Sequence, residues 1–321
     1  MDADAPNPLV AVVGATASGK SDLAVALARR LDGEVVNTDA MQLYRGMDIG
    51  TAKLGPAERQ GVPHHLLDVL DVTEPAAVAQ FQTWARDAVR DIWARGLVPV
   101  LAGGSGLYVR AVTDVLDFPG TDPQVRTAWE DELARVGPQA LHARLADLDP
   151  AAAEQILPSN GRRIVRALEV IELTGGPFTA TLPKPSRWHE PTVAVAIDVP
   201  RAELDARVAA RVDQMWSAGL VDEVRRLVDH GLRDSPTASR ALGYAQVLRF
   251  LAGEYGEDDA KARTVSATRR FVRRQDAWFR RDPRVTWLPS GPGLVEAAVD
   301  VVSSAVRGRS GGHHARPTIE S

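Results

Sequence analysis

GATASGKS, from Gly14 to Ser21, is the stretch that decides the fold of this 321-residue chain. It matches the phosphate-binding pattern G-x-x-x-x-G-K-[ST] in full. Its glycines let backbone N–H groups converge on phosphate oxygens, Lys20 adds a positive charge, and the Ser21 hydroxyl can ligate Mg²⁺. An apolar run, Leu9–Val13, precedes the stretch, and leucines recur at helical spacing over residues 23–31. This strand, loop and helix context predicts a phosphate-binding loop.

Short apolar runs and helical patterns alternate after this loop. Glu34–Asn37 and Leu97–Ala102 predict two further strands, and apolar residues at helical spacing predict a helix between them, from Phe81 to Ile92. Strands that alternate with helices imply a mostly parallel sheet covered by helices on both faces. The sequence therefore predicts an α/β fold with a core like that of the P-loop NTPases.

From Pro119 to Pro191 the pattern changes to helical segments separated by proline and glycine, with no strand. Val193–Val199 then predicts a returning strand, helices follow, and a last strand and helix are expected at Val285–Leu288 and Leu294–Val306. We therefore expect an all-helical insertion within the core. The expected parts are the first part of the core at 1–118, the insertion at 119–191, the second, largely helical part at 192–306 and a flexible tail at 307–321.

The composition excludes several classes of protein. The chain contains no cysteine, which rules out disulfides, thiolate zinc sites and cysteine nucleophiles. No stretch approaches the roughly 20 apolar residues of a membrane helix, so we expect a cytoplasmic protein, and a monomer by default. The formal charge is −4, yet nine basic and two acidic residues from Lys261 to Arg284 leave −11 on the rest of the chain. This segment either binds a polyanion or is only a solvated helix face.

Asp39 follows the second predicted strand, so we expect it at the same carboxyl edge of the sheet as the phosphate loop. There a carboxylate could accept a proton, bind magnesium, or cap a helix that starts near Met41. The strand ending at Ala102 is followed by Gly103-Gly104-Ser105, without a carboxylate. A nucleotide-hydrolysing enzyme needs a second acidic magnesium site at such a strand end, so the pattern disfavours a motor or switch NTPase.

Blocks of sequence between residues 9 and 288 resemble, in the same order, those of the tRNA dimethylallyltransferase family, also called tRNA isopentenyltransferases. The blocks are GATASGKS from Gly14, TDAMQLYRGMDIGTAK from Thr38, PHHLLD from Pro63, VLAGGSGLY from Val100, RRIVRALEV from Arg162 and RALGYAQ from Arg240. The stretch from Asp39 to Lys53 is far more specific than the phosphate loop. Higher-eukaryotic members carry a C-terminal zinc finger, which this cysteine-free chain cannot build.

The resemblance implies transfer of a dimethylallyl group from dimethylallyl diphosphate to N6 of the adenosine 3′ of the anticodon, in tRNAs reading codons that begin with U. It implies Mg²⁺ as cofactor and the tRNA anticodon stem-loop as partner, with no membrane. The donor diphosphate would be held by Gly14, Ala15, Thr16, Ala17, Ser18, Gly19, Lys20 and Ser21, with Ser21 on the metal. The implied catalytic set is Asp39 as the base with Lys20, Thr16 and one arginine on the diphosphate.

Two arginines fall where the family places its diphosphate arginine, Arg207 and Arg211, of which Arg211 is preferred. Ser105 stands where the family often has threonine, and it keeps the hydroxyl. The tRNA contacts implied by the resemblance are Asp39, Ala40, Met41, Gln42, Ser105, Arg126, Arg162, Arg163 and Arg166.

The chemistry of the acceptor supports this interpretation. The exocyclic amine of adenine is a poor nucleophile, so its attack needs a stabilised leaving group and removal of a proton. A stacked tRNA base must also be extruded to reach the site. Two alternatives stay open: an isopentenyltransferase acting on free AMP or ADP, and a small-molecule kinase or ATP-binding regulator. The arginine-bearing insertion argues against the first, and the missing carboxylate after Ala102 against the second.

Overall fold

The computed structural model describes residues 7–178, 186–189 and 191–310. They form two compact units, of which unit 1 combines Met1–Asp114 with Arg187–Ser321 and unit 2 is Val115–Ser186. The domain limits at residues 118 and 191, and the roles given to those parts, stay predictions.

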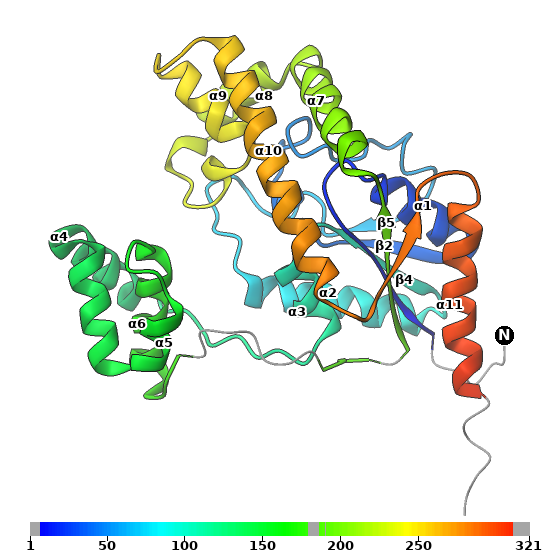
Figure 1. The fold of residues 1–321 in the computed structure, drawn as a ribbon, viewed down its shortest axis with the longest axis horizontal. Helices are drawn as coiled ribbons and strands as arrows, with labels where there is room; N and C mark the ends of the chain where they lie inside the picture. The colour runs from blue at the N-terminus through cyan, green and yellow to red at the C-terminus, as the bar shows by residue number, and fades with distance from the viewer. Residues whose placement is uncertain (1–6, 179–185, 190, 311–321) are drawn as a thin grey trace, which may run out of the picture. The chain divides into compact units, whose positions relative to one another are not determined.

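Unit 1 is built on a six-stranded sheet with the order β3-β2-β4-β1-β5-β6 (Figure 1). All neighbouring strands pair in parallel. The strands are β1 (Leu9–Val13), β2 (Gly33–Asn37), β3 (His64–His65), β4 (Val98–Gly103), β5 (Thr192–Asp198) and β6 (Val285–Pro289). The predicted α/β fold with a mostly parallel sheet is therefore confirmed. Only β3 had no forecast, because two residues are too few to show an apolar pattern.

Helices cover both faces of this sheet. They are α1 (Lys20–Arg30), α2 (Val78–Ala94), α3 (Gly106–Thr113), α7 (Arg201–Ser217), α8 (Leu220–Asp229), α9 (Tyr244–Leu251), α10 (Glu257–Arg280) and α11 (Leu294–Ser310), with the 3₁₀ helices η1 (Ala40–Leu43), η2 (Leu232–Asp234) and η3 (Ala238–Arg240). One hydrophobic cluster joins α1 and α11 to alternate residues of β1, such as Val10 and Val12. On the other side of the strands, α2 contacts β2 and β4, and α3 contacts β1 (Figure 1).

The last helix is longer than the sequence predicts. The expected end is Val306, but α11 extends to Ser310, because Gly308 is tolerated within a helix and the glycine pair that favours termination comes only at 311 and 312. The part of the expected tail from 311 to 321 lies outside the described residues.

The regular secondary structure in the described residues of unit 2 is all helical: α4 (Pro123–Leu148), α5 (Pro150–Gln155) and α6 (Gly161–Thr174). Asp122 caps α4 by accepting from two backbone N–H groups, and Asn160 caps α6. α4 is broken at Gly137, whose φ of 80° is left-handed and which Pro138 follows. The three helices share a core that includes Trp129, Leu141, Leu145, Ile156, Ile164 and Leu168.

The register of the sheet explains why unit 1 has a functional edge. Val13 at the end of β1 lies opposite Gly103 of β4, and Asn37 at the end of β2 lies opposite Ala102. The loops that leave these three strands therefore emerge side by side.

Candidate functional site

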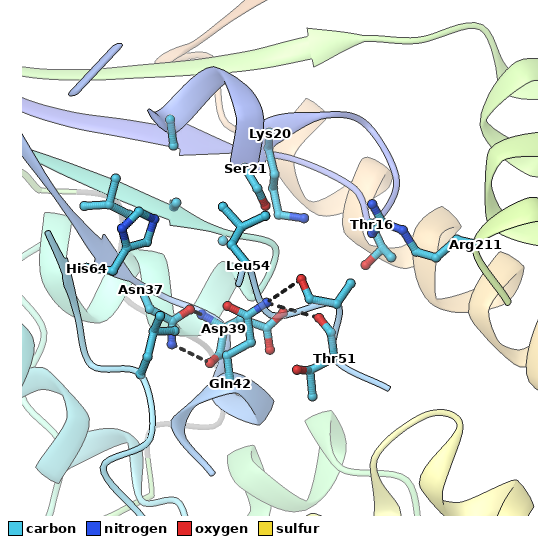
Figure 2. Close-up of a pocket in the computed structure, with 16 residues that line it drawn as sticks. Thr16, Lys20, Ser21, Asn37, Asp39, Gln42, Thr51, Leu54, His64 and Arg211 are labelled. Carbon is cyan, nitrogen blue, oxygen red and sulfur yellow. Dashed lines mark hydrogen bonds between the residues drawn. The ribbon is translucent and has the colours of Figure 1, made fainter. Parts of the chain in front are cut away.

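A pocket lies at this carboxyl edge, entirely within unit 1 (Figure 2). The phosphate loop and the start of α1 form one wall, and the end of β2 with η1 forms another. The rest of the lining comes from Arg211 of α7 and from residues of the loops, of β3 and of β4: Thr51, Ala52, Leu54, His64, Leu67, Ala102 and Gly103. Figure 2 shows Lys20 and Ser21 across the pocket from Asp39 and Gln42, with Arg211 beside Thr16. The pocket therefore joins a phosphate loop to a carboxylate.

The phosphate loop has the backbone that anion binding requires. Gly14, Ala17 and Gly19 all have positive φ, at 130°, 68° and 95°, which turns successive N–H groups toward one point. Ala17 holds this left-handed conformation with a Cβ, a strain that is typical of functional loops. The Ser18 side chain is buried and its Oγ has no hydrogen-bond partner among the described residues. An unpartnered buried hydroxyl in this loop fits a phosphate-bearing ligand.

Gln275 of α10 holds the loop from behind. Its Oε1 accepts the Thr16 N–H at 2.9 Å, and its Nε2 donates to the Gly104 carbonyl at 2.8 Å. The side chain therefore ties the phosphate loop to the residues after β4. The sequence analysis missed Gln275, since nothing local links it to residues 259 positions away.

Two cations, Lys20 and Arg211, face the pocket, and neither makes an ion pair among the described residues. Burial lowers the pKa of Lys20 to about 8; nearby Asp39 raises it and Arg211 lowers it further. Burial also lowers the pKa of Arg211 from its usual value. The hydrogen bond that Lys20 Nζ makes within the described part of the chain is with the Ala15 carbonyl, at 3.4 Å. Because a buried charge needs a counter-charge, the pair marks a site for a bound anion.

The structure separates the two candidate arginines of α7. Arg207 donates to Glu203 at 2.5 Å and to the Ser18 carbonyl at 3.4 Å, and it is not among the residues that line the pocket. Arg211 is the one that lines the pocket.

Asp39 is held in one orientation. Its Oδ1 accepts the Met41 N–H at 3.0 Å and so caps η1, and its own N–H donates to Asn37 Oδ1 at 2.8 Å. Asn37 Nδ2 in turn donates to the carbonyls of Asp39 and Leu66. Among the described residues no group donates to Asp39 Oδ2. The expected cap is confirmed, and one carboxylate oxygen remains free to accept a proton.

Gln42 and the loop behind it form the lower wall in Figure 2. Gln42 Nε2 donates to the carbonyls of Thr51, at 3.1 Å, and Ala52, at 3.5 Å. Lys53, whose side chain is only 3% exposed, pairs with both Asp48 and Asp68. The loop is therefore built to a defined shape.

The other predicted site residues lie elsewhere. Ala40 and Met41 belong to η1 but are not among the residues that line the pocket, and Ser105 is the N-cap of α3. The four insertion arginines, Arg126, Arg162, Arg163 and Arg166, all lie in unit 2.

Two of these arginines have internal partners that the sequence did not indicate. Arg126 and Arg166 both contact the carboxylate of Glu169, at 3.4 and 2.9 Å, and Glu169 is fully buried in α6. Arg162 and Arg163 are exposed. Their contacts with RNA stay predictions.

Sequence analysis also missed Asn37, Thr51, Leu54 and His64 as pocket residues. Asn37 could have been found from its place at a strand end, next to Asp39. His64 lines the pocket, and burial lowers its pKa. Its neighbour His65 is not among the lining residues and contacts Glu34 at 2.6 Å.

No group of three or more His, Asp or Glu side chains within residues 7–178, 186–189 and 191–310 could hold a metal ion. A cation in this pocket would therefore depend on oxygens of the ligand in addition to the Ser21 hydroxyl. In the same part of the chain, no helix is both long and apolar enough to cross a membrane.

Comparison with known proteins shows a consistent likeness. A family model described as IPP transferase matches residues 42–282. A tRNA dimethylallyltransferase of Thermobifida fusca is 66% identical over 301 residues, which cover 92% of this chain and 94% of that protein. One from Kineococcus radiotolerans is 67% identical over 295 residues, covering 90% and 93%.

Solved structures of tRNA-modifying transferases also resemble this chain. The tRNA isopentenylpyrophosphate transferase of Bacillus halodurans superposes with a TM-score of 0.71 at 39% identity, covering 96% of this chain and all of that one. A eukaryotic dimethylallyltransferase acting on tRNA shares the fold, with a TM-score of 0.77 at 24% identity, covering 95% of this chain and 77% of that one.

Proposed function

The chain belongs to the IPP transferase family, and we propose that it transfers a dimethylallyl group from dimethylallyl diphosphate to N6 of the adenosine 3′ of the anticodon in tRNA. The observation that carries this proposal is the pocket in which Lys20 and Arg211 face the carboxylate of Asp39 and make no ion pair among the described residues. Relatives about two-thirds identical over nine-tenths of the chain, all named tRNA dimethylallyltransferases, support it. The family resemblance of the sequence extends the proposal to tRNAs that read codons beginning with U.

The phosphate loop, Gly14–Ser21, binds the diphosphate of the donor in this proposal. The positive-φ backbone, the unpartnered Ser18 hydroxyl and the cations of Lys20 and Arg211 all suit two linked phosphates. Ser21 lines the pocket and would hold Mg²⁺ together with diphosphate oxygens. The ion, when bound, helps neutralise the charge of the leaving diphosphate.

Asp39 is the general base of the reaction. The adenine nitrogen forms a bond to the allylic carbon as that carbon's bond to oxygen breaks, and the electron pair leaves with the diphosphate. Asp39 accepts the N6 proton on Oδ2, the carboxylate oxygen to which no described residue donates. Lys20 and Arg211 stabilise the negative charge of the departing diphosphate. The cap that Asp39 forms on η1 keeps it in place.

The RNA partner is the anticodon stem-loop. Asp39, Ala40, Met41 and Gln42 contact the extruded base in this proposal, and Ser105 lines the channel that the base enters. Arg126, Arg162, Arg163 and Arg166 contact RNA phosphates. Arg162 and Arg163 are exposed, and the Arg126 side chain remains 35% exposed beside its partners. The enzyme acts as a monomer in the cytoplasm.

Direct assay tests the proposal. The purified chain is incubated with dimethylallyl diphosphate, Mg²⁺ and unmodified tRNA, with AMP and ATP as competitors, and the nucleosides are analysed by mass. We expect N6-(dimethylallyl)adenosine in the tRNA. Prenylated AMP without prenylated tRNA, or phosphate transfer from ATP, would contradict the proposal.

A further inference from the structure

Glu223 of α8 is a buried carboxylate held by neutral donors. Its side chain is almost inaccessible, at 2% exposure. It accepts the N–H groups of Asp48, Ile49 and Gly50, at 3.1, 2.8 and 3.2 Å. The Tyr244 hydroxyl adds a fourth donor at 2.5 Å. Among the described residues no cation pairs with Glu223, so these donors compensate its burial.

Tyr244 of α9 packs against Gly50, in the turn whose N–H groups bind Glu223. Burial raises the pKa of Tyr244 well above its usual value, and the Glu223 charge raises it further, so the hydroxyl stays protonated and donates. A Cβ on Gly50 would come within 2.4 Å of the Tyr244 ring. The backbone turn at residues 48–50 is therefore confined between α8 and α9.

This turn leads directly into the pocket wall. Thr51 and Ala52 come next, and their carbonyls accept from Gln42 Nε2. The Thr51 hydroxyl donates to the Met47 carbonyl at 2.6 Å, which closes the loop on itself. Since the amide N–H groups of Gln42 point at these carbonyls, its Oε1 is left as an acceptor, and no described residue donates to it.

We infer that Glu223 is a positioning residue for the acceptor base of the transfer reaction. It holds the turn at 48–50, the turn places the carbonyls of Thr51 and Ala52, and these orient Gln42 with its oxygen as an acceptor for an N–H group of the base. Glu223 lies on a helix 173 to 175 residues away in sequence from this turn and is not among the residues that line the pocket. The inference rests on the proposed function, in which Gln42 contacts the target adenosine.

Three single variants test it in the full chain. Glu223→Gln places an NH₂ group against backbone donors, and Tyr244→Phe removes one donor while leaving the carboxylate. Glu34→Gln is the matched control, because Glu34 is also a buried carboxylate of unit 1, at 6% exposure, but pairs with Arg95 and His65 and does not line the pocket. Thermal unfolding shows which variants are folded, and kcat and KM are measured separately for tRNA and for dimethylallyl diphosphate.

We expect Glu223→Gln to lower kcat/KM for tRNA about tenfold, the effect of losing one well-placed polar interaction. Tyr244→Phe should cause a smaller loss in the same parameter, and if Glu223→Gln does not fold, this variant carries the test. The KM for the donor should stay within about twofold of the parent. Glu34→Gln should change neither parameter, even if it lowers Tm.

A double-variant cycle with Gln42→Ala separates positioning from general loss of structure. If Glu223 acts through Gln42, then Glu223→Gln has little further effect on kcat/KM for tRNA once Gln42 is alanine. The inference would be overturned if the losses in kcat/KM for tRNA were additive in the double variant. It would also be overturned if Glu223→Gln weakened the use of tRNA and of dimethylallyl diphosphate equally, or if a folded Glu223→Gln variant had the kinetics of the parent. Failure of the parent chain to prenylate tRNA would instead overturn the proposed function.

Discussion

The pocket of unit 1 and the Glu169 cluster of unit 2 use the same kinds of side chain in opposite ways. In unit 2, Arg126 and Arg166 converge on a buried carboxylate, Glu169, which also accepts the Asp122 N–H. In the pocket, Lys20 and Arg211 lie across from Asp39, and neither makes an ion pair among the described residues. The charges around Glu169 are matched within the fold, whereas Lys20 and Arg211 in the pocket need a ligand.

The two buried carboxylates show the same contrast. Glu169 is compensated by arginines, but Glu223 is compensated by backbone N–H groups and a phenol. Because Glu223 pairs with no cation among the described residues, it does not neutralise Lys20 or Arg211, and both stay available for phosphate. The role of an arginine therefore depends on whether it has a carboxylate partner in the fold. Its place in a basic sequence pattern is not enough to predict that role.

Asp39→Asn is the sharpest test of the pocket side of this contrast. Asparagine keeps the oxygen that caps η1 but cannot accept the proton, so kcat should fall about 10²- to 10⁴-fold. Tm and the affinity for tRNA should change little, because the cap survives. Single-turnover transfer with labelled donor measures the effect, and a rate within about threefold of the parent would remove Asp39 from the role of base.

Glu169→Gln tests the unit 2 side. It leaves Arg126 and Arg166 beside a neutral group, and unit 2 should lose about 3 kcal/mol of stability. Hydrogen exchange of its backbone amides measures this loss. The control is Glu132→Gln, since Glu132 pairs with the largely exposed Arg135 and exposed ion pairs add little to stability.

The KM for the donor should be unchanged in Glu169→Gln, because every residue that lines the pocket belongs to unit 1. A raised donor KM without loss of protection in unit 2 would contradict the separation of roles.

Arg211→Ala and Arg207→Ala form a matched pair one helical turn apart. Loss of Arg211 should lower kcat/KM for dimethylallyl diphosphate about 10- to 100-fold, since contacts with a charged group are worth about 1.5–3 kcal/mol. Arg207 is already bound by Glu203, so its loss should change the same parameter by less than about threefold. If both variants lowered kcat/KM for dimethylallyl diphosphate equally, the assignment of Arg211 rather than Arg207 to the donor would be wrong.

The pH dependence of donor use should be the smallest effect. Lys20 is charged below its pKa of about 8 and neutral above it. In the free enzyme the cation that attracts diphosphate is therefore lost as pH rises through 8, and kcat/KM for the donor should be about tenfold lower at pH 9 than at its plateau. Lys20→Arg should show no inflection near pH 8, and an inflection that persists there would assign it to another group.

The local sequence pattern predicted the strands of unit 1 closely. The run at Leu9–Val13 is β1 to the residue, and the strands expected at 34–37 and 97–102 shift by one residue at one or both ends. The cap by Asp39 was also anticipated, because it depends on the next two residues alone. What local pattern could not show is which charged side chains find partners, as with Arg126 and Arg166.

By itself the sequence determined the phosphate loop, the alternation of strands and helices, and the family, because each depends on neighbouring residues or on contiguous motifs. Only the tertiary structure decided that Gln275 holds the Thr16 N–H, that Arg211 and not Arg207 reaches the pocket, and that Glu223 holds the turn at 48–50. The physical reason is that these contacts join residues far apart in the chain. Their geometry is set by how α7, α8 and α10 pack around the sheet edge, and no spacing along the chain encodes it.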